Sequence, residues 1–117
     1  MTVAPTEPDQ AKRFDAGKLL LDLVPPEFME GLCKPFMYGA AKYAPNLWKK
    51  NPMEQYRCLN SAQRHINQFR KGEQFDQEAL ALGWEIDHRL SAAWNLLVDW
   101  YYDEHPELVR PDGDGRR

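Results

Sequence analysis

Cysteine is scarce in this sequence, and long apolar segments are absent. The 117 residues include two cysteines, Cys33 and Cys58, and neither belongs to a Cys-x-x-Cys pair. This pattern excludes the common zinc motifs and a disulfide framework, so each thiol is expected to be a small buried apolar side chain. The chain also lacks a secretory segment and an apolar run of membrane-spanning length. A reduced, intracellular protein is therefore expected.

Net charge is small as well. The 15 Lys and Arg residues face 18 Asp and Glu residues, for a formal net charge of -3. Such a chain lacks the broad positive field of proteins that coat nucleic acid, so any phosphate must be bound locally, and neither long nucleic acid nor a membrane is an expected partner. The length suits one domain. We place it at residues 13–105, with flexible tails at 1–12 and 106–117.

The first half of the chain predicts short helical pieces. Pro25 and Pro26 favour a helix start, because proline at a first helical turn loses no hydrogen bond. Gly31 lowers helix propensity, and Pro35 removes an internal hydrogen bond, so a break or kink is expected just before Pro35. A second helical piece then covers residues 36–43.

The second half predicts two long helices. One runs from Pro52 to Gly72 on an apolar stripe at steps of three and four, formed by Tyr56, Leu59, Ala62, Ile66 and Phe69. The other covers residues 84–104 and is apolar over much of its circumference. The fold class is therefore all-α, a small helical bundle of three to four helices. The wide apolar surface of the last helix predicts a homo-oligomer, a dimer or larger.

Polar side chains are expected to converge where these two long helices meet. If the helices are antiparallel, His65, His88 and the acidic residues of the connecting loop share one end of the hairpin, with Asn95 on the face of His88. Imidazoles and carboxylates form a ligand set suited to Mg²⁺ or Mn²⁺. The alternative is that Glu73, Asp76 and Glu78 are solvated loop charges, with an acidic side chain near a helix N-terminus.

Cations and aromatic residues complete this candidate site. Lys18, Lys42 and Arg64 would neutralise the phosphate oxygens that a metal ion leaves free. Three aromatic side chains would stack on a base or, on the alternative interpretation, belong to the core. They are Tyr38, Tyr43 and Trp48.

Five ordered segments resemble the N-terminal domain of phage dATP/dGTP diphosphohydrolases. The segments are RFDAGKLLLDLVPPE, YGAAKYAPNLW, AQRHINQF, GEQFDQE and AAWNLL. That family is grouped by function with the all-α MazG-type nucleoside triphosphate pyrophosphohydrolases. Two features depart from the expected patterns: Ser91 stands where a second histidine is usual, and Glu54 alone occupies the window of the first MazG-type acidic pair.

The resemblance implies an enzyme that cleaves dGTP or dATP to the monophosphate and pyrophosphate. It implies Mg²⁺ or Mn²⁺ held by His65, Glu73, Asp76 and His88, with Glu73, Asp76 and Glu78 in catalysis. Substrate-binding positions carried over in the same way are Asp15, Lys18, Tyr38, Lys42, Tyr43, Asn46, Trp48, Arg64 and Asn95. Gly39 belongs to the same motif.

The resemblance also implies a place of action, the cytoplasm of the host cell if the chain is phage-encoded, and a supply of dGMP for 2-aminoadenine nucleotides. Two alternatives from other classes stay open. One is a nucleotide-binding module without turnover, and the other is a helical protein-interaction module.

Overall fold

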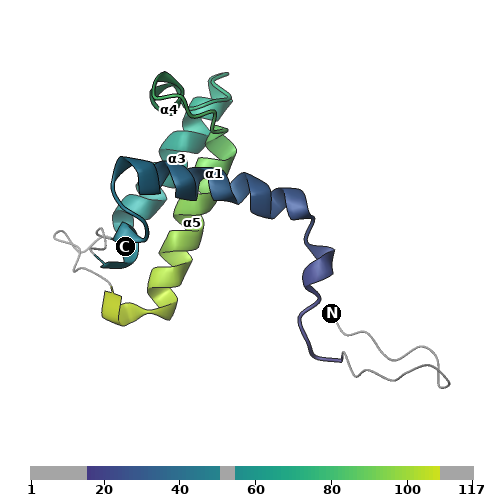
Figure 1. The fold of residues 1–117 in the computed structure, drawn as a ribbon. Helices are drawn as coiled ribbons and strands as arrows, with labels where there is room; N and C mark the ends of the chain where they lie inside the picture. Colours follow the sequence, from purple (N-terminus) through teal and green to yellow (C-terminus); the bar gives the residue numbers. More distant parts are fainter. Residues whose placement is uncertain (1–15, 51–54, 109–117) are drawn as a thin grey trace.

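The computed structural model describes residues 16–50 and 55–108, and within these ranges the chain is helical with no strand (Figure 1). This arrangement confirms the all-α class. Three helices are long, and the other elements are a turn or so in length. In chain order they are η1 (Leu21–Leu23), α1 (Pro26–Lys42), α2 (Leu47–Lys50), α3 (Tyr56–Arg70), α4 (Gln77–Ala81), α5 (His88–Glu104) and η2 (Pro106–Leu108).

Helices α3 and α5 form an antiparallel pair that holds the core (Figure 1). Cys58, Val98 and Tyr102 are fully buried between them, with Leu108 of η2 packed on the outside. The stripe predicted for α3 is buried only in part, because Ala62 is 2% exposed whereas Ile66 is 45% exposed. Cys58, which the prediction left out of the stripe, is buried with Val98 and Tyr102 of α5.

Polar bonds fasten the end of this pair that lies away from α4. The buried Gln55 amide donates to the Asp99 carbonyl at 3.2 Å and to the Asp103 carboxylate at 2.9 Å. The Tyr102 hydroxyl donates to the Trp48 carbonyl at 2.7 Å, which ties α2 to α5. Buried polar groups in native folds are normally satisfied in this way.

Helix α1 crosses α5 without interruption, so the predicted break before Pro35 is wrong. Pro35 and Gly31, the two residues expected to interrupt the helix, both lie at closely packed positions. Pro35 is the buried residue of the helix, and burial offsets its missing hydrogen bond. A Cβ on Gly31 would lie 3.2 Å from the Leu90 side chain, so glycine allows the close approach of α1 to α5. Cys33 is exposed, against the prediction that it is buried.

The segment before this crossing, residues 16–30, projects away from the helical pair and is called the arm here (Figure 1). It exposes large apolar side chains, among them Leu19 at 86% and Phe28 at 63%. Lys18 is an exposed residue of the arm. None of the helices in the described ranges has the length and apolar character to cross a membrane.

Candidate active site

The connection between α3 and α5 is pinned by backbone bonds that position two candidate site residues. The Asp76 amide donates to the Ile86 carbonyl, and the His88 amide donates to the Gln74 carbonyl, each at 2.9 Å. These bonds flank an isolated antiparallel bridge between Phe75 and Asp87. As a result, residues 84–87 belong to the connection, and the predicted helix start at residue 84 is wrong by one turn.

Two acidic side chains in this connection are N-caps of the helices that follow them. The Asp76 carboxylate accepts from the backbone amides of Glu78 and Ala79 at 3.0 and 3.4 Å, so it caps the short helix α4 inside the predicted loop. Asp87 caps α5 by accepting from the Arg89 amide at 2.8 Å. The bond from the Arg89 side chain, against some burial, lowers the pKa of Asp87 to about 2, so the cap stays charged.

The two imidazoles form a hydrogen-bonded chain with Glu73. Nδ1 of His65 lies 2.8 Å from Nδ1 of His88, and Nε2 of His88 lies 2.5 Å from a carboxylate oxygen of Glu73. The bond to His88 lowers the pKa of Glu73, so the carboxylate is ionised and accepts a proton held on Nε2. With Nε2 protonated, Nδ1 of a neutral His88 carries a lone pair. Burial, and the positive charge that a protonated His88 would bring close by, lower the pKa of His65 and favour its neutral form.

Asp76 joins these imidazoles in a group with the chemistry of a metal site. One ligand atom from each of His65, Asp76 and His88 lies within 4.8 Å of the other two. Two imidazole nitrogens and a carboxylate oxygen suit a divalent ion, so the residues present fit a bound metal. Glu73 is not in this group and holds His88 from the opposite ring nitrogen. A carboxylate that orients a ligating histidine in this way is a common companion of metal sites.

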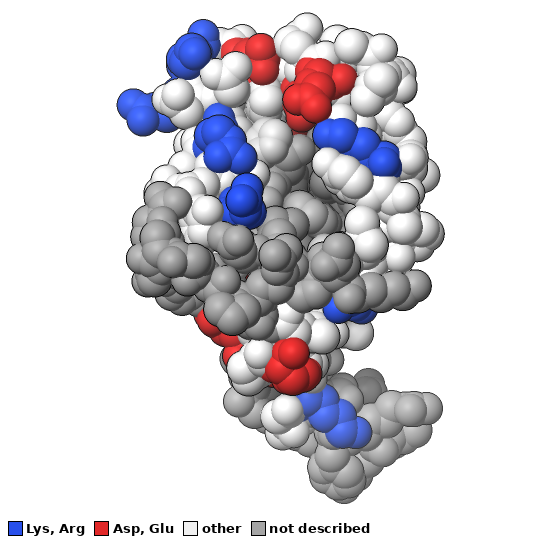
Figure 2. Space-filling view, turned by 90° about the vertical axis from the view of Figure 1, so that its left-hand side faces the viewer, with Lys and Arg blue, Asp and Glu red and all other residues white. Residues whose placement is uncertain are grey.

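The donor group opens onto two adjoining cavities. The polar cavity, about 610 Å³, is lined by His65 and His88 and by the carboxylates of Glu73, Asp76 and Glu78. The apolar cavity, about 600 Å³, shares Tyr38, Lys42, Tyr43, His65 and Asp76 with it and continues between α1 and α5. Each lies within the size range of small-molecule sites. In Figure 2, charged side chains stand around a hollow at the end of the molecule that α4 occupies.

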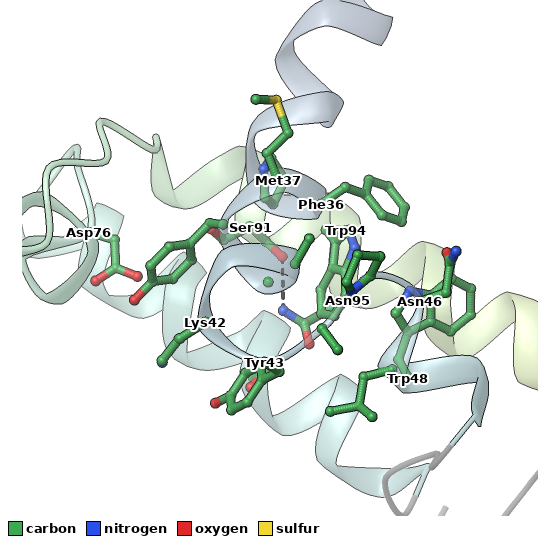
Figure 3. A pocket seen from close by; sticks show the side chains of 18 of the residues that line it. Phe36, Met37, Lys42, Tyr43, Asn46, Trp48, Asp76, Ser91, Trp94 and Asn95 are labelled. Atoms are coloured by element: carbon green, nitrogen blue, oxygen red, sulfur yellow. Dashed lines mark hydrogen bonds between the residues drawn. The ribbon is translucent and has the colours of Figure 1, made fainter.

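The apolar cavity has a polar and an aromatic end. Figure 3 shows Asp76 at one side and Asn46 and Trp48 at the other, with Trp94 and Asn95 of α5 between them. The Asn95 amide donates to the Ser91 carbonyl at 2.9 Å, which holds it against its own helix. The aromatic half of the cavity, near Trp48 and Trp94, suits a flat heterocycle. The half near Asp76 suits charged groups.

Two of the predicted cations line the polar cavity. Lys42 lies over the rings of Tyr38 and Tyr43, with its ammonium 5.2 and 5.4 Å from their centroids. Burial opposes the charge of Lys42, but its hydrogen bond to Glu78 and its other neighbours raise its pKa, so it stays protonated. Arg64 donates to the Ser61 hydroxyl at 2.8 Å and is otherwise exposed.

Several predicted site residues lie elsewhere or have other partners. Lys18 lines neither cavity, because the arm that carries it projects away from the site. Glu78 is 74% exposed and pairs with Lys42 at 3.2 Å, so its position is that of a partner for the cation. Asp15, Glu54 and Pro52 lie outside the described residues. Ser61 and Trp94 line the apolar cavity although the sequence analysis gave neither a role in the site.

The chain is similar to one known protein family over most of its length. The family described as "dATP/dGTP diphosphohydrolase, N-terminal" matches residues 8–111. The chain belongs to this family. A curated dATP/dGTP diphosphohydrolase of Salmonella phage PMBT28 is 29% identical over 106 residues, which cover 90% of this chain and 32% of the relative. The chain thus spans about a third of that relative's length. Among solved structures, none matches.

For this member of the dATP/dGTP diphosphohydrolase N-terminal family, most of the segments that carry the resemblance line the two adjoining cavities. The segment 38–48 supplies aromatic walls and Lys42, the segment 62–69 supplies His65, and the segment 72–78 supplies the acidic residues. Trp94 and Asn95 come from the last segment. The described part of the first segment, residues 16–27, lies in the arm and lines neither cavity.

Proposed function

We propose that this chain hydrolyses purine deoxynucleoside triphosphates, dGTP or dATP, to the monophosphate and pyrophosphate with the help of Mg²⁺ or Mn²⁺. The observation that carries the proposal is the group of His65, Asp76 and His88, whose ligand atoms converge beside a cavity large enough for a nucleotide. The names of the family and of the phage relative support the choice of substrate.

The two halves of the site divide the work on the substrate. The triphosphate occupies the polar cavity, where Lys42 and Arg64 neutralise oxygens that gain charge as the reaction proceeds. The base enters the aromatic half, and the reacting α-phosphorus lies near the imidazoles. Water adds its oxygen to the α-phosphorus, the bond to the bridging oxygen breaks, and pyrophosphate leaves with that electron pair.

His65, Asp76 and His88 would hold the divalent ion. When bound, the ion supplies positive charge against phosphate oxygens and makes a nearby water more acidic. The contribution of Glu73 is positional, because its bond to Nε2 keeps Nδ1 of His88 turned toward His65. The dGMP released from dGTP would then be available for synthesis of 2-aminoadenine nucleotides.

Assembly with a second copy is part of the proposal. The arm exposes six large apolar side chains, and α5 exposes Leu96, Leu97 and Trp100 on the face turned away from the core. At about 60–120 Å² for each buried apolar side chain, the arm alone supplies a large share of the roughly 800 Å² that each partner buries in a stable interface. Because both surfaces are on one chain, two copies can cover each other symmetrically.

The function is tested by incubating the purified chain with each of the four deoxynucleoside triphosphates. Mg²⁺, Mn²⁺ or EDTA is added, and mono-, di- and triphosphates are separated. The expected result is metal-dependent conversion of dGTP or dATP to the monophosphate with an equal amount of pyrophosphate. Binding of these nucleotides without pyrophosphate release would instead indicate a non-catalytic nucleotide-binding module. A diphosphate product would contradict the proposed bond cleavage.

A further inference from the structure

The carboxylates that line the polar cavity are already engaged by other partners. Glu73 accepts from Nε2 of His88, and Glu78 pairs with the Lys42 ammonium at 3.2 Å. One oxygen of Asp76 accepts the first backbone amides of α4. At least one oxygen of each carboxylate is thus occupied, so the protein offers an ion fewer oxygen ligands than three acidic residues suggest.

The two imidazoles, by contrast, are arranged as neighbouring ligands of one ion. Nδ1 of His65 lies 2.8 Å from Nδ1 of His88, and each ring has a ligand atom within 4.8 Å of an Asp76 oxygen. Two neighbouring nitrogens bonded to the same ion, each at about 2.1 Å, are about 3 Å apart. The observed separation is close to this value, so an ion can replace the hydrogen bond between the rings with little movement of either ring.

We propose that His65 and His88 make this site selective for a first-row transition ion, Mn²⁺, over Mg²⁺. Mg²⁺ takes oxygen ligands and gives up its water reluctantly, so two imidazoles are a poor set of ligands for it. Imidazole suits transition ions, and two imidazoles with one carboxylate leave positions open on the ion. Mn²⁺ also accepts oxygen ligands, which a triphosphate supplies. The choice of Mn²⁺ among transition ions therefore rests on the proposed function.

The test measures metal binding to the purified chain without nucleotide, so that it does not depend on turnover. Affinities for Mn²⁺ and Mg²⁺ are determined by calorimetry, and bound Mn²⁺ is examined by pulsed electron paramagnetic resonance, which detects directly bonded nitrogen. Residues that only orient a metal-binding histidine are worth about 10-fold in metal affinity. Each imidazole should be worth at least that much, so Mn²⁺ is expected to bind at least about 100-fold more tightly than Mg²⁺, with a nitrogen coupling in the spectrum.

His65→Asn exchanges one ligating nitrogen for an amide oxygen. It should weaken Mn²⁺ binding by more than about 10-fold but Mg²⁺ binding by much less, and so reduce the preference. His105→Asn is the matched control, because the chain contains three histidines and His105 is the one outside the site. The His105 ring stacks on Tyr101 with centroids 4.1 Å apart, and His105 lines neither cavity. This variant should keep the affinities and the nitrogen coupling of wild type.

Several results would overturn the inference. One is equal affinity of wild type for Mn²⁺ and Mg²⁺, and another is Mn²⁺ bound without a nitrogen coupling, which would leave carboxylates as the ligands. Equal losses of Mn²⁺ affinity in His65→Asn and His105→Asn would mean that imidazoles bind the ion nonspecifically. Selective Mn²⁺ binding through nitrogen, without pyrophosphate release from any of the nucleotides, would keep this inference and reject the proposed hydrolysis. Hydrolysis that is as fast with Mg²⁺ alone as with Mn²⁺ would do the reverse.

Discussion

The end of the fold that carries α4 and the arm differ in whether their side chains find partners within the chain. At the end that carries α4, Asp76 and Asp87 cap helices, and the imidazoles of His65 and His88 are held in a chain with Glu73. In the arm, large apolar side chains such as Leu19 and Phe28 are exposed. The candidate site is therefore preorganised by one chain, whereas the arm needs another surface to bury its side chains. Changes at the two ends should have separable effects.

The largest effect is expected for Asp76→Asn, which separates the two roles of this residue. Asparagine caps a helix about as well as aspartate, so α4 should persist. The loss of the carboxylate charge should reduce turnover of dGTP by at least about 100-fold, the range seen when a group acting on the reacting centre is removed. Pyrophosphate release and the melting temperature are measured on the same preparation.

Asp76→Ala is the comparison for this variant, because alanine removes the cap as well as the charge. We expect it to lose activity like Asp76→Asn and, in addition, about 1 kcal/mol of stability, the typical value of an N-cap. Full activity in Asp76→Asn would remove Asp76 from the site and leave it with a capping role alone.

A smaller effect is expected for Glu73→Gln, because Glu73 bonds to His88 and is not one of the three grouped residues proposed to hold the metal ion. Glutamine can still accept from Nε2 of His88, but it lacks the charge that strengthens this bond. We expect a loss of about 10- to 100-fold in affinity for Mn²⁺, the usual range for carboxylates that orient ligating histidines. Metal affinity is measured by calorimetry.

The control for this variant is Glu85→Gln, an exposed carboxylate of the same connection. It carries the same loss of charge and should bind Mn²⁺ as wild type does. If both variants lose affinity equally, the effect is one of overall charge, and the bond between Glu73 and His88 is not important for the metal.

Sequence reasoning could predict the convergence of the site because that depends on topology. If two long helices that follow each other in a small chain pack as antiparallel neighbours, their connection lies at one end of the pair, and this arrangement brings His65, Asp76 and His88 together. It could not predict which carboxylate faces which atom. That difference arises from the bridge between Phe75 and Asp87 and from the cap on α4, which depend on backbone pairing and leave no apolar period in the sequence.

Other misses have a similar cause. Local propensity made Gly31 and Pro35 helix breakers, but the close approach of Gly31 to Leu90 and the burial of Pro35 override it, as tertiary packing commonly does. Trp94 belongs to the helix predicted to be apolar over much of its circumference, and the sequence does not show that its N–H is buried without a partner among the described residues.

The arm is tested by Phe28→Asp, which places a charge among side chains expected to be buried in the assembly. Removing a buried Phe from an interface costs roughly 1.5–3 kcal/mol, so the dissociation constant should rise by about 10- to 100-fold. Analytical ultracentrifugation over a concentration series measures this shift. Lys34→Glu changes the charge of an exposed position farther along α1 and should leave assembly unchanged. A wild-type chain that is monomeric at all concentrations would contradict assembly through the arm.

The smallest expected effect is on stability, and it is tested by two separate Asp→Ala variants, one at each end of the molecule. Asp87→Ala removes the carboxylate that caps α5 and also accepts from the Arg89 side chain at 2.8 Å and from Gln74 at 3.2 Å. It should lower the free energy of unfolding by about 1 kcal/mol. Asp22→Ala makes the same change in the exposed arm and should stay within about 0.5 kcal/mol of wild type, as surface changes usually do.

Urea denaturation of both variants at one protein concentration gives the comparison directly, with assembly held constant. Equal losses of stability would mean that the arm is held by specific polar contacts like those at the site. A loss confined to Asp87→Ala would place the polar stabilisation of the chain at the end where α3, α4 and α5 meet, and would leave the arm to be stabilised by apolar contact with a second copy.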